Sequence, residues 1–231
     1  MNQAAHAALR TPMHFKPLRT MAFGALLTLG TLAAHADAID SLETFVKTVK
    51  SGRAAFTQTV TSPPREGQAA RTKTSTGSFE FQRPSRFRFV YTKPFEQTIV
   101  ADGQTLWLHD VDLNQVTARK QADVLGSTPA ALVAAAPDLA ALRADFDLKA
   151  APDADGLQWV EATPKTKDGQ LAAVRVGLKP GDKGPELAAL DIQDSFGQRS
   201  VLRFSQVEVN PSLPAASFQF KPPAGADVLR Q

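Results

Sequence analysis

The sequence predicts a mainly β protein in which about nine to eleven antiparallel strands curl towards a barrel, with short helices at the start and in the middle of the chain. Three observations support this fold class. Hydrophobic and polar residues alternate with a period of two over most of the stretch 56–209. The connections between the alternating segments are too short for crossover helices, so successive strands must pair antiparallel. Two segments depart from the alternation, at 39–49 and 123–143, and both have helical features.

The N-terminus has the features of a secretory signal peptide. Arg10, Lys16 and Arg19 precede an uncharged, Leu- and Ala-rich stretch at 20–34, and Ala34-His35-Ala36 is a small-x-small cleavage pattern. The apolar stretch is short for a membrane span. We therefore expect residues 1–36 to be removed and residues 37–231 to form one domain.

Composition excludes several classes of function once the predicted leader is set aside. The leader carries three of the 26 basic residues and no acidic one, so 23 basic and 23 acidic residues remain, which argues against a nucleic-acid-binding surface. Three of the four histidines also belong to the leader, and the chain has no cysteine. Cysteine-containing zinc sites are therefore excluded. A secreted chain without disulfides fits a bacterial periplasm.

The first element after the leader is a predicted amphipathic helix. Asp40-x-x-Glu43 has the spacing of a capping box, apolar residues follow at helical spacing, and Ser51-Gly52 ends the segment.

The strands follow in an almost continuous meander. Residues 62–76, which include Pro63-Pro64, are predicted to form a mobile hairpin loop. Asp102-Gly103 is a two-residue hairpin signal, and Asp155-Gly156 and Asp168-Gly169 indicate tight turns. The predicted strands lie at 56–60, 79–82, 86–91, 97–101, 105–109, 115–120, 145–150, 157–164, 171–178, 187–194 and 198–209.

Two helices are predicted where the meander is interrupted. Thr128-Pro129 is an N-cap followed by proline at the first helical position, and an alanine-rich run continues to Ala136. Pro137-Asp138 begins a second short helix through Leu142. These helices offer few bulky side chains, so we expect them to form a weakly held lid over the mouth or concave face.

Motifs for catalysis or metal binding are weak. Asp110-x-Asp112-x-Asn114 has the opening spacing of a calcium loop, but Gln115 and Gln121 stand where glycine and glutamate are expected, so a polar turn is the preferred interpretation. His109 lies on an alternating strand and is interpreted as a structural residue. Phosphate-loop, nucleophile-elbow and dinucleotide signatures are missing, so no catalytic residue, metal or cofactor is expected.

Aromatic residues are concentrated on a few neighbouring strands. They fit either an ordinary barrel core or the wall of an apolar cavity, and the alanine-rich cover favours the cavity. The residues are Phe56, Phe79, Phe81, Phe87, Phe89, Tyr91, Phe95 and Trp107.

Segments along nearly the whole of 37–231 resemble the LolA family of periplasmic lipoprotein carriers. The longest match is Gln82-Arg83-Pro84-Ser-Arg-Phe87-Arg-Phe89, continuing through Ile99-Val-Ala-Asp102-Gly103-Gln-Thr-Leu106-Trp107 to Asp112-Leu-Asn-Gln115. Other matches are Phe56-Thr-Gln58, Gly77-Ser-Phe79, Gly126-Ser-Thr-Pro129, Asp194-Ser-Phe-Gly197-Gln198 and Phe218-Gln-Phe220-Lys-Pro-Pro-Ala-Gly225.

This resemblance implies an unclosed antiparallel β-barrel of about 11 strands covered by short α-helices. It implies a monomeric carrier without enzymatic activity that takes lipoproteins from the inner-membrane complex LolCDE and delivers them to the outer-membrane receptor LolB. Arg83 would hydrogen-bond the lid and hold it closed. Ala130 and Ala131 stand where bulkier lid residues are expected. The lipid-binding cavity would comprise Phe56, Phe79, Phe81, Phe87, Phe89, Tyr91, Trp107, Leu132 and Val133.

Two alternatives stay open at this point. One is a related periplasmic regulator that senses lipid or lipoprotein during envelope stress, although such proteins usually carry a second domain. The other is a hydrolase of unrecognised type, against which the single histidine outside the leader argues.

Overall fold

The computed structural model describes residues 33–64, 68–125, 136–166, 170–181 and 184–231. The helices are α1 (Ala33–Thr48), α2 (Gln121–Leu125), α4 (Leu139–Asp145) and the 3-10 helix η1 (Ala215–Phe218). The strands are β1 (Ser51–Ser62), β2 (Arg71–Gln82), β3 (Arg86–Lys93), β4 (Gln97–Ala101), β5 (Thr105–Asp110), β6 (Gln115–Lys120), β7 (Phe146–Ala154), β8 (Leu157–Pro164), β9 (Leu171–Lys179), β10 (Glu186–Asp194), β11 (Arg199–Val209) and β12 (Asp227–Arg230).

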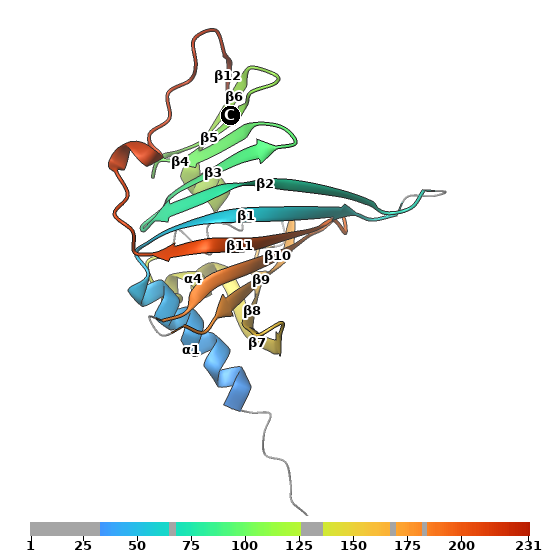
Figure 1. Cartoon of the computed structure of the whole chain (residues 1–231), viewed down its shortest axis with the longest axis vertical. Coiled ribbons are helices and arrows are strands. Elements are labelled where there is room, and N and C mark those ends of the chain that lie inside the picture. The colour runs from blue at the N-terminus through green and yellow to red at the C-terminus, as the bar shows by residue number, and fades with distance from the viewer. Residues whose placement is uncertain (1–32, 65–67, 126–135, 167–169, 182–183) are drawn as a thin grey trace, which may run out of the picture.

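All twelve strands belong to one strongly curved sheet, in the order β12-β6-β5-β4-β3-β2-β1-β11-β10-β9-β8-β7 (Figure 1). Neighbours from β6 to β7 pair antiparallel, as predicted, and the two ends of the order, β12 and β7, are not paired with each other within the described residues. The sheet is therefore an unclosed barrel, which confirms the predicted fold class.

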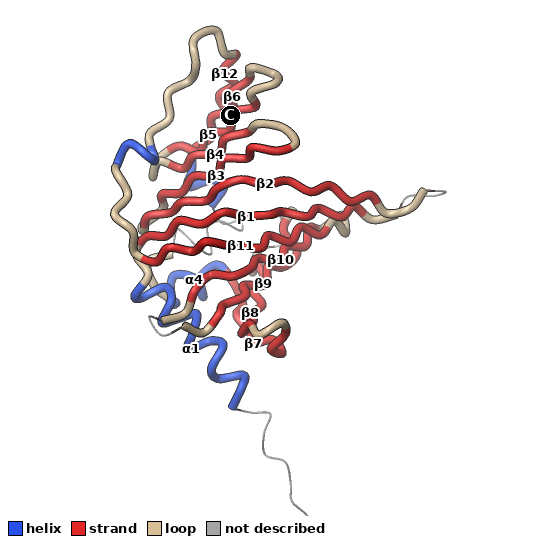
Figure 2. Tube along the Cα trace, viewed as in Figure 1, coloured by secondary structure: helices blue, strands red, loops and turns tan. Residues whose placement is uncertain are grey.

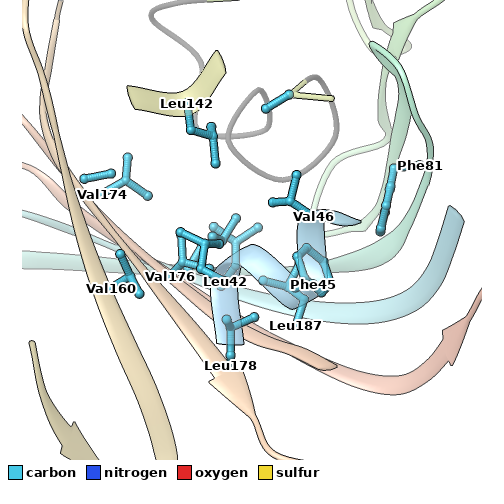
Figure 3. Close-up of a cluster of buried hydrophobic side chains, with 14 of the residues drawn as sticks. Leu42, Phe45, Val46, Phe81, Leu142, Val160, Val174, Val176, Leu178 and Leu187 are labelled. Carbon is cyan, nitrogen blue, oxygen red and sulfur yellow. The ribbon is translucent and has the colours of Figure 1, made fainter. Parts of the chain in front are cut away.

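Helix α1 covers one half of the concave face. The helix packs against β7, β8 and β9 and buries Leu42, Phe45 and Val46, which Figure 3 shows among valines and leucines of the strands. Val49, directly after the helix, is also buried. The predicted capping box is wrong, because α1 begins at Ala33 and Asp40 lies inside it. The alanines before Asp40 are strong helix formers and extend the helix upstream. The predicted cleavage site after Ala36 falls within α1, and cleavage itself stays a prediction.

Close approach between strands is made possible by a glycine in β2. A side chain at Gly77 would place its Cβ 2.0 Å from the Val90 carbonyl oxygen and 2.9 Å from the Phe56 ring. The phenyl ring of Phe56 thus occupies the space above the glycine, which lets the aromatic residues of β1, β2 and β3 form one layer.

Most strand positions agree with the prediction, but four local expectations differ. The 62–76 loop is wrong in length, because β2 already begins at Arg71 and pairs there with Ser62. The β4–β5 connection has three residues, 102–104, because Asp102 Oδ1 accepts the N–H groups of Gln104 and Thr105. Helix α2 was not predicted. The strand β12 was not predicted either, and it pairs parallel to β6 after a long loop that includes η1 (Figure 2).

One turn and one helix confirm the local sequence signals. Asp155 and Gly156 form the two-residue β7–β8 turn with φ values of +56° and +72°, as a type I′ turn requires. Asp138 caps α4 by accepting the N–H of Ala141 at 2.8 Å. The predicted helix at 128–136 and the turn at Asp168-Gly169 lie largely or wholly outside the described residues.

Candidate functional site

An apolar cavity of about 290 Å³ lies on the part of the concave face that α1 leaves free. We call it the inner cavity. Strands from both halves of the barrel contribute to it, because the curvature of the sheet brings β3–β5 to face β10 and β11. Its lining residues are Gln58, Phe87, Phe89, Tyr91, Ile99, Leu106, Leu108, Leu190, Ile192 and Leu202.

Three of the predicted cavity aromatics, Phe87, Phe89 and Tyr91, line this cavity. They occupy alternate positions of β3, which places them on one face. Phe87 is nevertheless only 2% exposed, so it belongs to the packed wall as well as to the cavity surface.

The other β1 and β2 aromatics lie beside that wall, on the same concave face of the sheet. Phe79 stacks on Phe89 with ring centroids 4.3 Å apart, and Phe56 meets Tyr91 edge-on at 5.0 Å. Phe81 packs against Phe45 of α1 at 6.3 Å. Phe56, Phe79 and Phe81 are buried and do not line the inner cavity. The aromatic layer therefore forms part of the barrel core and part of the cavity wall, so each of the two interpretations of the aromatic residues holds for some of them.

Trp107 was expected in the cavity, and the structure corrects this. Leu106 and Leu108 line the cavity, so the residue between them on β5 points to the opposite face. There the Trp107 ring packs 5.5 Å from Phe220, and its Nε1 donates to Asp102 Oδ2 at 2.9 Å. His109 lies on the same outer face, 5.9 Å from the Phe220 ring, in a packing position. Leu132 and Val133 lie outside the described residues.

Arg83 lies in the β2–β3 turn and connects the barrel with its cover. Its Nε donates to the carbonyl of Val49 at the end of α1 (2.9 Å), and its Nη1 donates to the carbonyl of Ala136 (2.8 Å). The guanidinium also lies over the rings of Phe45 and Phe81, 5.4 and 5.5 Å from their centroids. Only 8% of Arg83 is exposed, and this burial lowers its pKa to about 10.

The third nitrogen of this guanidinium has no acceptor among the described residues. Nη2 is buried and has no hydrogen-bond partner in the part of the chain that the structure describes. A buried cation with an unused donor is held at an energetic cost.

A second, more open cavity of about 590 Å³ adjoins the first. We call it the outer cavity. Gln58 and Tyr91 line both cavities, and the exposed side chains of Phe95 (62%) and Leu113 (71%) lie on the rim. The remaining lining residues are Ser75, Pro94, Glu96, Gln97, Asp110 and Asp112.

The residues of the calcium-like motif form a turn at this rim. Asp110 Oδ1 accepts the N–H of Leu113 at 3.1 Å, and Asn114 has a φ of +49° and donates to the Gly225 carbonyl. No group of three or more potential metal ligands occurs among the residues described. The polar turn accounts for these side chains.

Several cavity residues were not singled out from the sequence. Ile99, Leu106, Leu108, Leu190, Ile192 and Leu202 are all strand residues at alternating positions. They can be identified from the alternation of side chains along each strand. The antiparallel pairing places them on the same face of the sheet as Phe87 and Phe89. Gln58 alternates with Phe56 and Val60 on β1, so its position also places it on the inner face, but its polar side chain gives no reason to expect it in an apolar lining.

Within the described residues, no helix has the length and apolar character needed to cross a membrane.

Comparison with known proteins assigns the chain to a family. The family model for outer membrane lipoprotein carrier protein LolA matches residues 47–221. The chain is 72% identical over 198 residues to an outer-membrane lipoprotein carrier protein of Albidiferax ferrireducens, covering 86% of this chain and 93% of that protein. A protein of the same name from Methylibium petroleiphilum is 58% identical over 207 residues, covering 90% and 96%.

Solved structures align with the chain at low sequence identity. A DUF1329 family protein from Desulfovibrio piger aligns with a TM-score of 0.50 and 12% identity over 81% of this chain and 96% of that chain. A LolA superfamily protein from Nitrosomonas europaea aligns with a TM-score of 0.46 and 13% identity over 80% and 98%. With the family model covering most of the chain and relatives this similar, the chain belongs to the LolA family of outer-membrane lipoprotein carrier proteins.

Proposed function

We propose that the chain is a periplasmic carrier that shields the acyl chains of lipoproteins in its inner cavity, receives them from LolCDE, delivers them to LolB, and catalyses no reaction. The single observation that carries this proposal is the apolar cavity on the concave face of the barrel, which is lined almost entirely by phenylalanine, leucine and isoleucine side chains. The names of the relatives support the choice of lipoprotein as cargo.

Shielding is needed because acyl chains partition strongly out of water. Each buried methylene contributes about 0.8 kcal/mol, so release of a triacylated anchor into water is very slow. Cargo must therefore pass directly from one apolar cavity to the next. The exposed Phe95 and Leu113 at the outer rim would provide apolar contact during such a passage.

The closed cavity must enlarge to take the cargo. About 300–1,000 Å³ is typical of sites for drug-sized molecules, and the inner cavity has about 290 Å³. Several long acyl chains exceed that space. Loading therefore displaces the cover, and the contact between Arg83 and Ala136 is the polar contact that has to break.

Delivery without a cofactor requires the carrier to bind cargo less tightly than the acceptor does. A contact that stabilises the closed, empty state lowers the apparent affinity for cargo, because the intrinsic affinity is multiplied by the fraction of molecules that are open. Arg83 supplies such a contact, so it favours release.

The proposal is tested by purifying the protein from the periplasm and analysing it by mass spectrometry. Co-purifying triacylated lipoprotein that moves to purified LolB supports the carrier. Bound lipoprotein that never moves to LolB supports the sensing regulator instead. A cargo-free protein that turns over a member of a substrate panel contradicts the proposal and supports an enzyme.

The rim gives one further prediction. Phe95→Asp is expected to slow transfer to LolB about threefold to tenfold, because it removes exposed apolar surface at the rim. Stability should change by less than about 0.5 kcal/mol, since the side chain is 62% exposed. Transfer kinetics and thermal unfolding measure the two effects, and Phe196→Asp, at an equally exposed phenylalanine in the β10–β11 turn, is the control. Equal slowing by both variants would show that the rim has no special role.

A further inference from the structure

The inner and outer cavities meet at two polar side chains, Gln58 and Tyr91. On the inner side, every other lining residue is a phenylalanine, leucine or isoleucine. On the outer side, the lining includes Ser75, Gln97 and the carboxylates of Glu96, Asp110 and Asp112. Polarity therefore changes at this pair, as it does in an amphiphile where acyl chains join the head.

Gln58 retains hydrogen-bonding capacity towards the cavities. Its Nε2 donates to the hydroxyl of Ser200 on β11 at 2.7 Å, which fixes the carboxamide. A carboxamide offers two N–H donors and one acceptor oxygen. No other partner of this group is found in the part of the chain that the structure describes, so a second donor and the acceptor are available to a ligand.

Tyr91 supplies a second donor beside it. Its ring is fixed between Phe56 at 5.0 Å and Phe89 at 6.4 Å, and burial raises its pKa to about 12. The hydroxyl is thus protonated at physiological pH. It too makes no hydrogen bond to any residue described in the structure.

A purely structural role does not account for these groups. The strands β1 and β11 are already paired from Gly52–Val209 to Thr61–Arg199, so a side-chain bond between them adds little. An aliphatic residue at position 58 would complete the apolar lining. A polar group at an apolar cavity costs free energy unless something binds it.

We propose that Gln58 and Tyr91 donate hydrogen bonds to the ester and amide carbonyl groups that join the acyl chains of the cargo to its head. This inference rests on the proposed carrier function and adds a binding site to it. The two donors set the depth to which the chains enter, with the chains in the inner cavity and the head in the outer one. The carboxylates of Glu96, Asp110 and Asp112 disfavour an anionic head, so an uncharged glyceryl-cysteine is preferred over an anionic phospholipid.

The test uses the full chain and two synthetic probes. The first is a triacylated glyceryl-cysteine peptide, and the second is its analogue with every acyl carbonyl replaced by a methylene. Binding is measured by displacement of an environment-sensitive fluorophore. The wild-type protein should bind the carbonyl probe about threefold to tenfold more tightly than the analogue for each hydrogen bond formed.

Two variants remove one donor each. Gln58→Leu should weaken binding of the carbonyl probe about threefold to tenfold, and Tyr91→Phe should do the same while keeping the ring. Neither should weaken binding of the methylene analogue. Thr59→Val is the matched control, because this neutral polar residue is the next one on β1 and faces the opposite side.

The outcomes separate this inference from the proposed function. If the wild-type protein binds neither probe, the carrier function itself fails. If it binds both probes equally, or if Gln58→Leu and Tyr91→Phe weaken both probes alike, the carrier function stands and the carbonyl site is overturned. If Gln58→Leu does not fold, Tyr91→Phe alone decides the matter.

Discussion

Arg83→Leu is expected to load lipoprotein normally and to transfer it to LolB at least about tenfold more slowly than the wild-type protein. The variant removes the donors to the Val49 and Ala136 carbonyls, and in the proposed function these contacts hold the cover closed over the empty cavity. A hydrogen bond from a charged donor contributes about 1.5–3 kcal/mol. Losing that contribution to the closed state tightens cargo binding about tenfold to a hundredfold.

Stability should change little in the same variant. Burial lowers the pKa of Arg83 to about 10 from 12.5, so holding this charge inside costs on the order of 3 kcal/mol. Leucine removes that cost but leaves two carbonyls without donors, at about 1–3 kcal/mol each. The opposing effects leave a net change within about 3 kcal/mol. A single-turnover transfer assay and denaturant unfolding measure the two quantities.

Arg86→Leu is the control for this substitution. Arg86 is three residues away, at the start of β3, and its guanidinium lies over the Phe218 ring at 5.9 Å, on the outer face. It should transfer cargo at the wild-type rate. Wild-type transfer by Arg83→Leu, or failure of that variant to load at all, would contradict a role in release.

The sheet was predictable because its information is local. The alternation of apolar and polar residues in segments such as Phe87-Arg88-Phe89 indicates which side chains face inwards. Asp155-Gly156 indicates where the chain turns back to form the next strand. Antiparallel neighbours in sequence then fix the order from β1 to β6 and from β7 to β11. The parallel pairing of β12 with β6 has no such signal, since Asp227–Arg230 is short and reached only after a long loop.

The cavity was harder to predict than the strands that line it. Aromatic content alone does not distinguish Phe79 from Phe89, because both side chains lie on the inner face of their strands. Phe79 packs beside the cavity wall, whereas Phe89 faces the cavity. Their difference depends on where α1 lies on the sheet. The prediction for Trp107 was wrong because it grouped all aromatic residues of these strands in one cavity. The alternation of side chains along β5 instead places Trp107 on the outer face, with Phe220.

Phe87→Glu is expected to lower lipoprotein uptake at least tenfold, by about 1.4 kcal/mol or more, while leaving the fold intact. Phe87 lines the inner cavity, so the introduced carboxylate enters space that acyl chains must fill. A carboxylate without a partner in apolar surroundings is strongly unfavourable, and it draws in water that the chains would have to displace. The smaller side chain fits without overpacking, because the 290 Å³ cavity adjoins it.

The matched variant is Phe79→Glu, at the phenylalanine next to this wall, directly opposite Phe89 on the neighbouring strand. Phe79 is 1% exposed and enclosed by Phe81, Phe89 and Phe204, so a carboxylate there has no cavity to enter. Losing a buried phenylalanine costs about 3–5 kcal/mol, and the buried charge adds to this, against a total stability of about 5–15 kcal/mol. Circular dichroism should therefore show an unfolded Phe79→Glu and a folded Phe87→Glu that binds little lipid. If both unfold, Phe87 belongs to the core alone; if Phe87→Leu loses as much uptake as Phe87→Glu, side-chain size rather than polarity controls entry to the cavity.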